Sequence, residues 1–167
     1  MASGKSTVAE ALARRLPRAA HVRGDTFRRF IVSGAAPITP EMSPEARAQL
    51  ELRYRLSAHA GDAYVAAGFT AIVQDVVLGP WLERYLEYVQ SRPLHVVVLN
   101  PSPAAIAARE AARPKTGYKD GWGIEASHRD FLATTPRLGL WLDTSALSVD
   151  KTVDTILADP ATSLVRP

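Results

Sequence analysis

The sequence contains no cysteine, and this absence excludes a disulfide framework and any metal site built on thiolates. It also lacks an apolar run long enough to cross a bilayer and a stretch with the features of a signal peptide, so we expect a cytoplasmic protein with no membrane partner. An excess of one charge is missing too, because 20 Lys and Arg stand against 17 Asp and Glu, a net charge of +3 at pH 7. That excess is too small to imply nucleic-acid binding, and it suits an anionic small molecule equally well.

The 167 residues, of which 47% are hydrophobic, suit one globular domain over 1–167 with a real core. Helical and strand-like segments alternate along this length. Strands are predicted over 19–23, 69–77, 94–99 and 138–143, and helices over 6–16, 44–67, 80–90, 103–112, 124–132 and 148–157, with a frayed tail after residue 160. This alternation is typical of an α/β three-layer sandwich, in which a parallel sheet carries helices on both faces.

The strongest motif lies at the start of the chain, in Ala2-Ser3-Gly4-Lys5-Ser6-Thr7. Its last four residues match the closing half of the phosphate-binding P-loop, Gly-x-x-x-x-Gly-Lys-[Ser/Thr]. Glycine lets backbone N–H groups approach phosphate oxygens, lysine brings positive charge to the β- and γ-phosphates, and the serine hydroxyl ligates Mg²⁺. A segment with helical apolar spacing follows the motif and ends at Pro17. Residues 2–7 are therefore predicted to bind a nucleotide, with ATP and Mg²⁺ as cofactors.

The same motif is incomplete in this sequence. Its first glycine would stand two positions upstream of Met1, and the strand that normally feeds the loop is missing as well. In P-loop folds that strand is central, and its loss would leave neighbouring strands with unpaired edges. Two explanations stay open: the sequence starts at an internal methionine, or the loop is degenerate and works without its first glycine.

Two carboxylates stand at the carboxyl ends of strands, where ligands bind in open α/β sheets. Asp25 follows the strand 19–23 and can accept the proton of a substrate hydroxyl that attacks the γ-phosphate, or it could simply cap the segment behind it. Asp75 ends the most apolar strand, in the position of a carboxylate that holds Mg²⁺ together with Ser6, or it could be a solvated loop residue. Gln74 points to the opposite face of that strand and is given no role.

Cations for the transferring phosphate are predicted within residues 109–123. Arg109 and Arg113 lie four residues apart on one helix face, and Lys115 follows them. Because glycines accompany these cations, we predict a mobile lid that closes over the γ-phosphate and expels water, with Arg109 and Lys115 on the nucleotide. A solvated basic face is the alternative. Three further residues could bind an acceptor or be ordinary surface charge: Arg28, Arg29 and Arg53.

Together these residues resemble the small P-loop kinases, in particular the chloramphenicol phosphotransferase-like group, over nearly the whole chain. The resemblance lies in Gly4-Lys5-Ser6-Thr7, Gly24-Asp25-Thr26-Phe27, Ile72-Val73-Gln74-Asp75-Val76-Val77 and Arg109-x-x-x-Arg113. The second segment looks like the one that bears the family's base Asp, and the last is similar to the lid arginines of gluconate and adenylylsulfate kinases. Zeta-toxin kinases, which phosphorylate a UDP-amino sugar, share the Asp-x-Phe-Arg pattern of residues 25–28. The resemblance implies a nucleoside monophosphate kinase-like fold with a five-stranded parallel sheet.

The sequence therefore predicts an ATP-dependent O-phosphotransferase that moves the γ-phosphate to a hydroxyl of a small antibiotic- or metabolite-like molecule. In this interpretation Lys5 grips the phosphates, Asp25 activates the acceptor hydroxyl, and the two arginines of the lid stabilise the transferring group. Two alternatives stay open. One is a nucleotide or sugar kinase of central metabolism, or a zeta-toxin-like UDP-sugar kinase. The other is a nucleotide-binding protein without catalysis.

Overall fold

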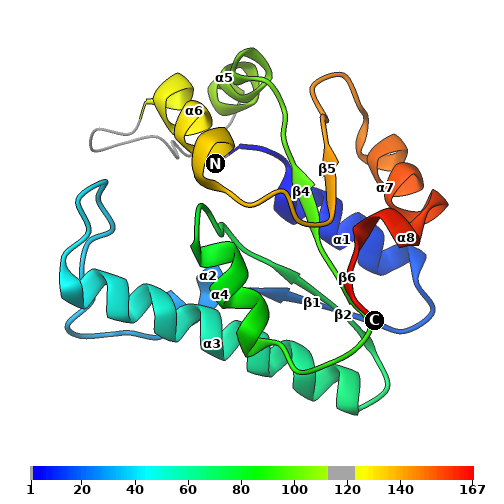
Figure 1. Ribbon diagram of the computed structural model, residues 1–167, viewed down its shortest axis with the longest axis horizontal. Coiled ribbons are helices and arrows are strands. Elements are labelled where there is room, and N and C mark those ends of the chain that lie inside the picture. Colours follow the sequence, from blue (N-terminus) through cyan, green and yellow to red (C-terminus); the bar gives the residue numbers. More distant parts are fainter. Residues whose placement is uncertain (1, 113–122) are drawn as a thin grey trace.

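The computed structural model describes residues 2–112 and 123–167, and Figure 1 labels the elements found there. The helices are α1 Lys5–Arg15, α2 Asp25–Arg29, α3 Pro44–Ala66, α4 Trp81–Tyr88, α5 Pro103–Ala111, α6 Ile124–Thr134, α7 Val149–Ala158 and α8 Pro160–Ser163. The strands are β1 Ala19–Arg23, β2 Thr70–Gln74, β3 Leu94–His95, β4 Val97–Leu99, β5 Leu140–Leu142 and β6 Leu164–Arg166. Two residues of the predicted lid, Arg113 and Lys115, lie outside the described residues.

Parallel pairing joins the strands in two places. β1 pairs with β2, placing His21 opposite Ile72, and β4 pairs with β5, placing Val98 opposite Trp141. Figure 1 shows the first pair in the lower half of the view with α3 and α4, and the second pair in the upper half with α5, α6 and α7. Parallel strands with helices packed around them confirm the predicted α/β class.

The pairing differs from the continuous five-stranded parallel sheet that the resemblance implied. The described strands form three two-stranded ladders, and one of them, β3 with β6, is antiparallel. The predicted strand 94–99 divides at Val96, whose N–H donates to Ser163 O and whose carbonyl accepts from Leu140 N. The two halves of this segment therefore pair with different strands: β3 pairs with β6, and β4 pairs with β5.

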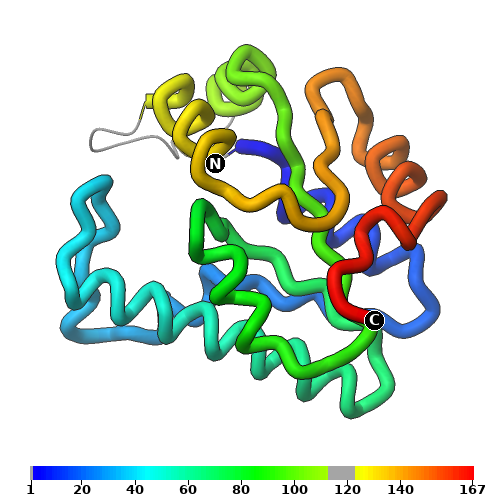
Figure 2. Tube along the Cα trace, viewed as in Figure 1, coloured from blue at the N-terminus to red at the C-terminus, as the bar shows by residue number. Residues whose placement is uncertain are grey.

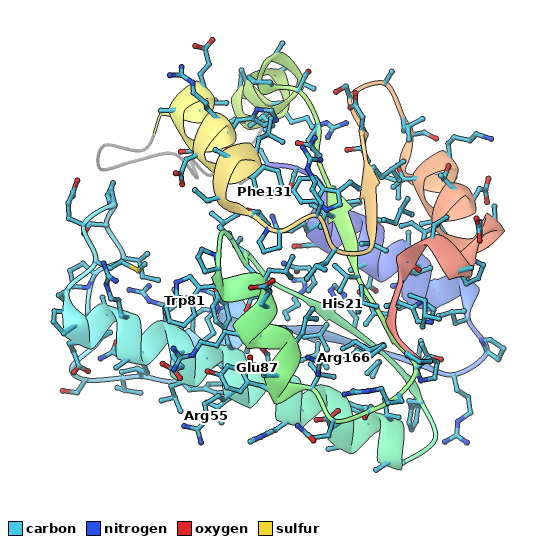
Figure 3. All side chains as sticks on the ribbon, viewed as in Figure 1. His21, Arg55, Trp81, Glu87, Phe131 and Arg166 are labelled. Atoms are coloured by element: carbon cyan, nitrogen blue, oxygen red, sulfur yellow. The ribbon has the colours of Figure 1, made fainter. Side chains whose placement is uncertain are left out.

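The expectation of a frayed tail after residue 160 is wrong. The Asp159 side chain caps α8 by accepting from Ala161 N, and β6 then pairs with β3. Arg166 Nη1 donates to Leu86 O at 3.1 Å, which ties the last strand to the end of α4 (Figure 3). These contacts join segments far apart in the sequence, so the local pattern of the tail did not reveal them.

Serine–proline pairs start two of the helices, as the sequence predicts. Ser43 Oγ accepts a hydrogen bond from Ala46 N, and Ser102 Oγ accepts one from Ala105 N. Each serine is followed by a proline, whose fixed φ suits the first helical position. Before α3, the segment 30–43 projects from the rest of the chain as a loop, on the left of the view in Figure 2.

Apolar clusters fix the helices on both faces of the strands. On one face α3 and α4 pack together through Leu50, Tyr54 and Tyr85, against the partly buried Val73 of β2. Gly61 allows α3 to approach β2 closely, since a Cβ there would stand 2.8 Å from Val73 Cγ2. On the other face α1 and α7 pack through a separate cluster of Val8, Val153 and Ile156. Among the described residues, none of the helices combines the length and the apolar character that crossing a bilayer requires.

Candidate active site

The loop that leads into α1 has the backbone shape of an anion-binding turn. Ala2 and Gly4 have positive φ angles of 49° and 87°, and no atom of the described residues is recorded within 4 Å of the place where a Gly4 Cβ would stand. Left-handed residues in such a turn direct successive N–H groups to one side. The first turn of α1 holds no acidic residue, and no side chain caps it, so the positive end of the helix dipole is not neutralised by a carboxylate there. Lys5 Nζ donates to Ser3 Oγ at 3.1 Å, which keeps its ammonium beside the loop.

Ser6 lies in the first turn of α1 and reaches across to the end of β2. Its Oγ donates to Gln74 Oε1 at 2.9 Å, joining residues 68 positions apart. The backbone of Gln74 also anchors the preceding strand, because Gly24 N donates to Gln74 O at 2.9 Å. Gln74 had been given no role from the sequence, and the structure places it directly beside the P-loop serine.

Asp25 occupies the first position of α2, just after β1. Its side chain is 59% exposed and lies 3.6 Å from Arg29 Nη2 in an (i, i+4) ion pair. An exposed carboxylate at the carboxyl end of a strand can be reached by a substrate. Asp25 therefore meets the positional requirement for a base that accepts a proton from a bound hydroxyl.

The side chain of Asp75 is buried and bound within the molecule. The guanidinium of Arg53 on α3 holds both of its oxygens, with Nε donating to Oδ2 at 3.0 Å and Nη2 donating to Oδ1. Val76 N also donates to Oδ1, at 2.6 Å. The side chains of Asp75 and Arg53 are only 2% and 9% exposed. A buried carboxylate engaged in this way is typical of a charge pair that is compensated within the fold.

Arg53 connects this buried pair to the surroundings of Asp25. Burial lowers the pKa of the Arg53 guanidinium, while the negative charge of Asp25 acts to raise it and the positive charge of Arg28 to lower it. Gly24 leaves the room that the pair needs, because a Cβ at this position would collide with the carboxylate of Asp75. Asp25, Asp75 and Arg53 thus form one charged cluster at the ends of β1 and β2.

The remaining predicted cations bind backbone or neighbouring side chains. Arg28 Nη2 donates to Ala36 O at 2.7 Å, in the loop before α3, and Arg29 Nη2 donates to Thr26 Oγ1 at 3.1 Å. Arg109 Nη2 donates to Thr144 O at 2.5 Å, just after the end of β5. The structure thus places Arg109 at the carboxyl end of the second parallel pair, whereas Arg28 and Arg29 follow the first.

A hollow of about 670 Å³ lies outside this cluster, between α3 and α4. Its lining includes Arg55 and Glu87, labelled in Figure 3, together with Glu51. Glu51 Oε1 already accepts from Arg84 Nη2 and from the Tyr88 hydroxyl, each at 2.7 Å. None of the predicted site residues that the structure describes lines this hollow, so its size alone does not make it the active site.

The oxygen donors near the P-loop fit a magnesium ion held mainly by a nucleotide. Within residues 2–112 and 123–167, no three His, Asp or Glu side chains gather in a way that could hold a metal ion. Mg²⁺ in nucleotide sites usually keeps several waters and takes few protein ligands besides the phosphates. The Ser6 hydroxyl, with its proton directed to Gln74, meets that requirement.

Comparison with known proteins shows the family and the fold of this chain. A model of the AAA domain family matches residues 1–138. The chain belongs to the AAA domain family. A sugar kinase of Janibacter sp. HTCC2649, in an unliganded crystal structure, is similar to this AAA domain chain over 98% of its length and 94% of the kinase, at 20% identity and a TM-score of 0.66.

A second solved structure has the same fold. The tunicamycin resistance protein of Deinococcus radiodurans matches 99% of this AAA domain chain and 93% of its own length, at 17% identity and a TM-score of 0.63. A search of curated proteins finds no match. The AAA domain chain therefore has a P-loop NTPase-like α/β fold, which it shares with these solved structures.

Proposed function

We propose that this AAA domain chain is an ATP-dependent phosphotransferase that phosphorylates a hydroxyl group of a small molecule. The observation that carries the proposal is the pairing of two features at one end of the parallel strands. One is the loop 2–4, with its left-handed turns and Lys5 at the start of α1. The other is the exposed carboxylate of Asp25 at the end of β1.

The nucleotide side of the site consists of the N–H groups of residues 2–7, the Lys5 ammonium and the Ser6 hydroxyl. In this proposal the loop and Lys5 bind the β- and γ-phosphates of ATP, and Ser6 helps to hold Mg²⁺. Bound Mg²⁺ would neutralise charge that develops between the β- and γ-phosphates. Arg109 and, outside the described residues, Arg113 and Lys115 are proposed to approach the phosphates from a lid.

The transfer step needs one proton acceptor. The acceptor oxygen forms a bond to the γ-phosphorus, the bond from that phosphorus to the β-phosphate bridging oxygen breaks, and ADP leaves. Asp25 takes the proton that the hydroxyl loses. Arg28, Arg29 and Arg53, which surround Asp25 in sequence or in space, are proposed to orient the acceptor.

Two measurements on the 167-residue chain test this function. Calorimetric titration with Mg-ADP and Mg-ATP is expected to show binding, and a panel of sugars, nucleosides and aminoglycoside-like alcohols is then screened for transfer of labelled γ-phosphate.

The Asp25→Asn variant should bind Mg-ADP like the wild type but lose transfer by at least a hundredfold, as removal of a general base does. Asp150→Asn, an exposed carboxylate on α7, is the matched control and should keep full activity. Unchanged transfer in Asp25→Asn would sink the base assignment, and a folded chain without nucleotide binding would contradict the function itself.

A further inference from the structure

The end of β2 offers two polar side chains to two different partners. Gln74 is the last residue of β2 and Asp75 follows it, and their side chains bind different partners. Gln74 Oε1 accepts from Ser6 Oγ at 2.9 Å, whereas Asp75 Oδ2 accepts from Arg53 Nε at 3.0 Å. We propose that Gln74, and not Asp75, supports Ser6 as a magnesium ligand at the P-loop. Asp75 is instead a positioning residue that fixes Arg53 beside Asp25.

The hydrogen bond to Gln74 prepares Ser6 to act as a metal ligand. A hydroxyl that binds a cation must turn its proton away, so that an oxygen lone pair faces the ion. The Gln74 carbonyl receives that proton, which is the usual task of an outer-shell partner of a metal ligand. An amide does this without adding negative charge. The surroundings of the Ser6 hydroxyl are therefore less anionic than they would be with a carboxylate as its partner.

The surroundings of Asp75 oppose a metal role for that residue. Both carboxylate oxygens accept from Arg53, and Oδ1 also accepts from Val76 N. With 2% of its side chain exposed, Asp75 could turn to an ion at Ser6 only if Arg53 were left buried without its counter-charge. That loss is strongly unfavourable inside a protein.

The same contacts explain what Asp75 does instead. Two donors of Arg53 are bound to it, and the guanidinium carbon of Arg53 lies 5.8 Å from the centre of the ring of Tyr54, the next residue on α3. A guanidinium held at two points keeps one orientation. Gly24, the residue before Asp25, lies directly against the carboxylate that holds it. Arg53 is thereby fixed close to the junction of β1 and α2, where Asp25 begins the helix. This inference rests on the proposed function, because it divides the roles within that site.

The first test is the effect of Mg²⁺ on ADP affinity, measured by calorimetry in Mg²⁺ and in EDTA. The full chain is compared with Gln74→Leu, Gln74→Glu and Asp75→Asn. Mg²⁺ should tighten ADP binding in the wild type. In Gln74→Leu the ratio of ADP affinity in Mg²⁺ to that in EDTA should be about tenfold smaller, the usual effect of removing an outer-shell partner. Gln74→Glu should retain or increase the gain, and Asp75→Asn should keep it within twofold. Affinity in EDTA should be equal in all four proteins, which shows that each retains a folded loop.

The second test follows the Arg53 side chain by NMR, using the ¹H–¹⁵N signal of its Nε. This signal should be slow to exchange in the wild type and in Gln74→Leu, stay in place when Mg-ADP is added, and be lost in Asp75→Asn. Arg53→Gln identifies the signal.

A Mg²⁺ gain that disappears in Asp75→Asn but persists in Gln74→Leu would overturn the assignment, as would an Arg53 signal that Mg-ADP displaces. Equal ADP affinity in Mg²⁺ and EDTA in the wild type would overturn the metal role of Gln74 while leaving nucleotide binding intact. Absence of ADP binding would contradict the proposed function first.

Discussion

The contact between Lys5 and Ser3 spans two residues of an open loop, whereas the contact between Arg53 and Asp75 joins residues 22 positions apart within the interior. The proposed phosphate side of the site is therefore a local structure, set by backbone angles and by the start of one helix. The proposed acceptor side depends on how α3 packs on β2, and it holds a charge pair that the fold must compensate. Changes on the first side should mainly alter binding, and changes on the second should also alter folding stability.

The largest expected effect comes from Asp75→Ala. This change leaves the buried Arg53 guanidinium without its counter-charge, and such losses cost about 3–5 kcal/mol. Urea denaturation followed by circular dichroism would measure the free energy of unfolding. Asp25→Ala is the matched control, because its 59% exposed carboxylate should change stability by no more than about 0.5 kcal/mol. Equal stability of the two variants would remove the contrast between the two sides of the site.

Lys5→Ala should show the reverse pattern. We expect the affinity for Mg-ADP to fall about a hundredfold, or about 2.7 kcal/mol, while the free energy of unfolding changes by less than about 0.5 kcal/mol. Calorimetric titration and urea denaturation of the same preparation measure the two quantities. Lys151→Ala on α7 removes an exposed cation and should change neither. A marked loss of stability in Lys5→Ala would show that the loop is part of the folding core after all.

Gly24→Ala tests the junction between the two sides. A Cβ at residue 24 collides with the carboxylate of Asp75, so the buried pair must shift, and overpacking of this kind costs about 1–3 kcal/mol. Gly123→Ala is the control, since among the described residues a Cβ there meets Ala126 Cβ alone, at an ordinary 3.8 Å. Thermal denaturation of the two variants should separate them, and equal melting temperatures would contradict the close packing around Asp75.

The smallest effect is expected at alkaline pH, beneath the acceptor side. Burial raises the pKa of Tyr54 and of Tyr85 to about 12, from an ordinary value of 10.0. Each phenol ionises more readily in the unfolded chain, so its stabilising contribution is complete below pH 10 and is lost as the pH rises to 12. At pH 11 one such group accounts for a loss of about 1.4 kcal/mol relative to neutral pH.

Tyr85→Phe isolates this contribution. The variant should lose less stability than the wild type between pH 9 and pH 11, by about 1.4 kcal/mol. Ser57 Oγ, which contacts the Tyr85 hydroxyl, keeps its bond to Tyr54 O and is not orphaned. Tyr64→Phe, at a position that is 46% exposed, serves as the control and should follow the wild-type curve. Parallel curves for all three proteins would contradict the burial effect.

The local parts of this fold could be read from the sequence. Serine–proline pairs predicted the starts of α3 and α5, and the apolar runs predicted β1 and β2 close to where they lie. These features depend on neighbouring residues, whose preferences act within one turn or one strand. The predicted positions of Asp25 and Asp75 at strand ends followed from the same patterns.

The partners of the site residues could not be read in the same way. Strand alternation separates Gln74 from Asp75, but which of them meets Ser6 depends on how α1 packs across a separation of 68 residues. One signal did exist for the buried pair. Arg53 lies among the buried positions of α3, between Leu50 and Ser57, and a charge on a buried helix face requires a partner. The pairing of the tail with β3 had no comparable signal, because β6 has only three residues.

The hydrogen bond from Gly24 N to Gln74 O also sets a limit on motion within the site. It joins the ends of β1 and β2, and the Tyr54 hydroxyl, which donates to Val76 O at 2.7 Å, joins the same place to α3. A backbone amide held in such a hydrogen bond between two strands exchanges with solvent only when the surrounding structure unfolds locally. Asp25, the proposed base, and Ser6 would therefore keep a constant separation through a catalytic cycle. Any movement that brings the two substrates together would have to come from segments around these two hydrogen bonds, such as the loop 30–43. The Gly24 amide should be among the slowest amides of the chain to exchange.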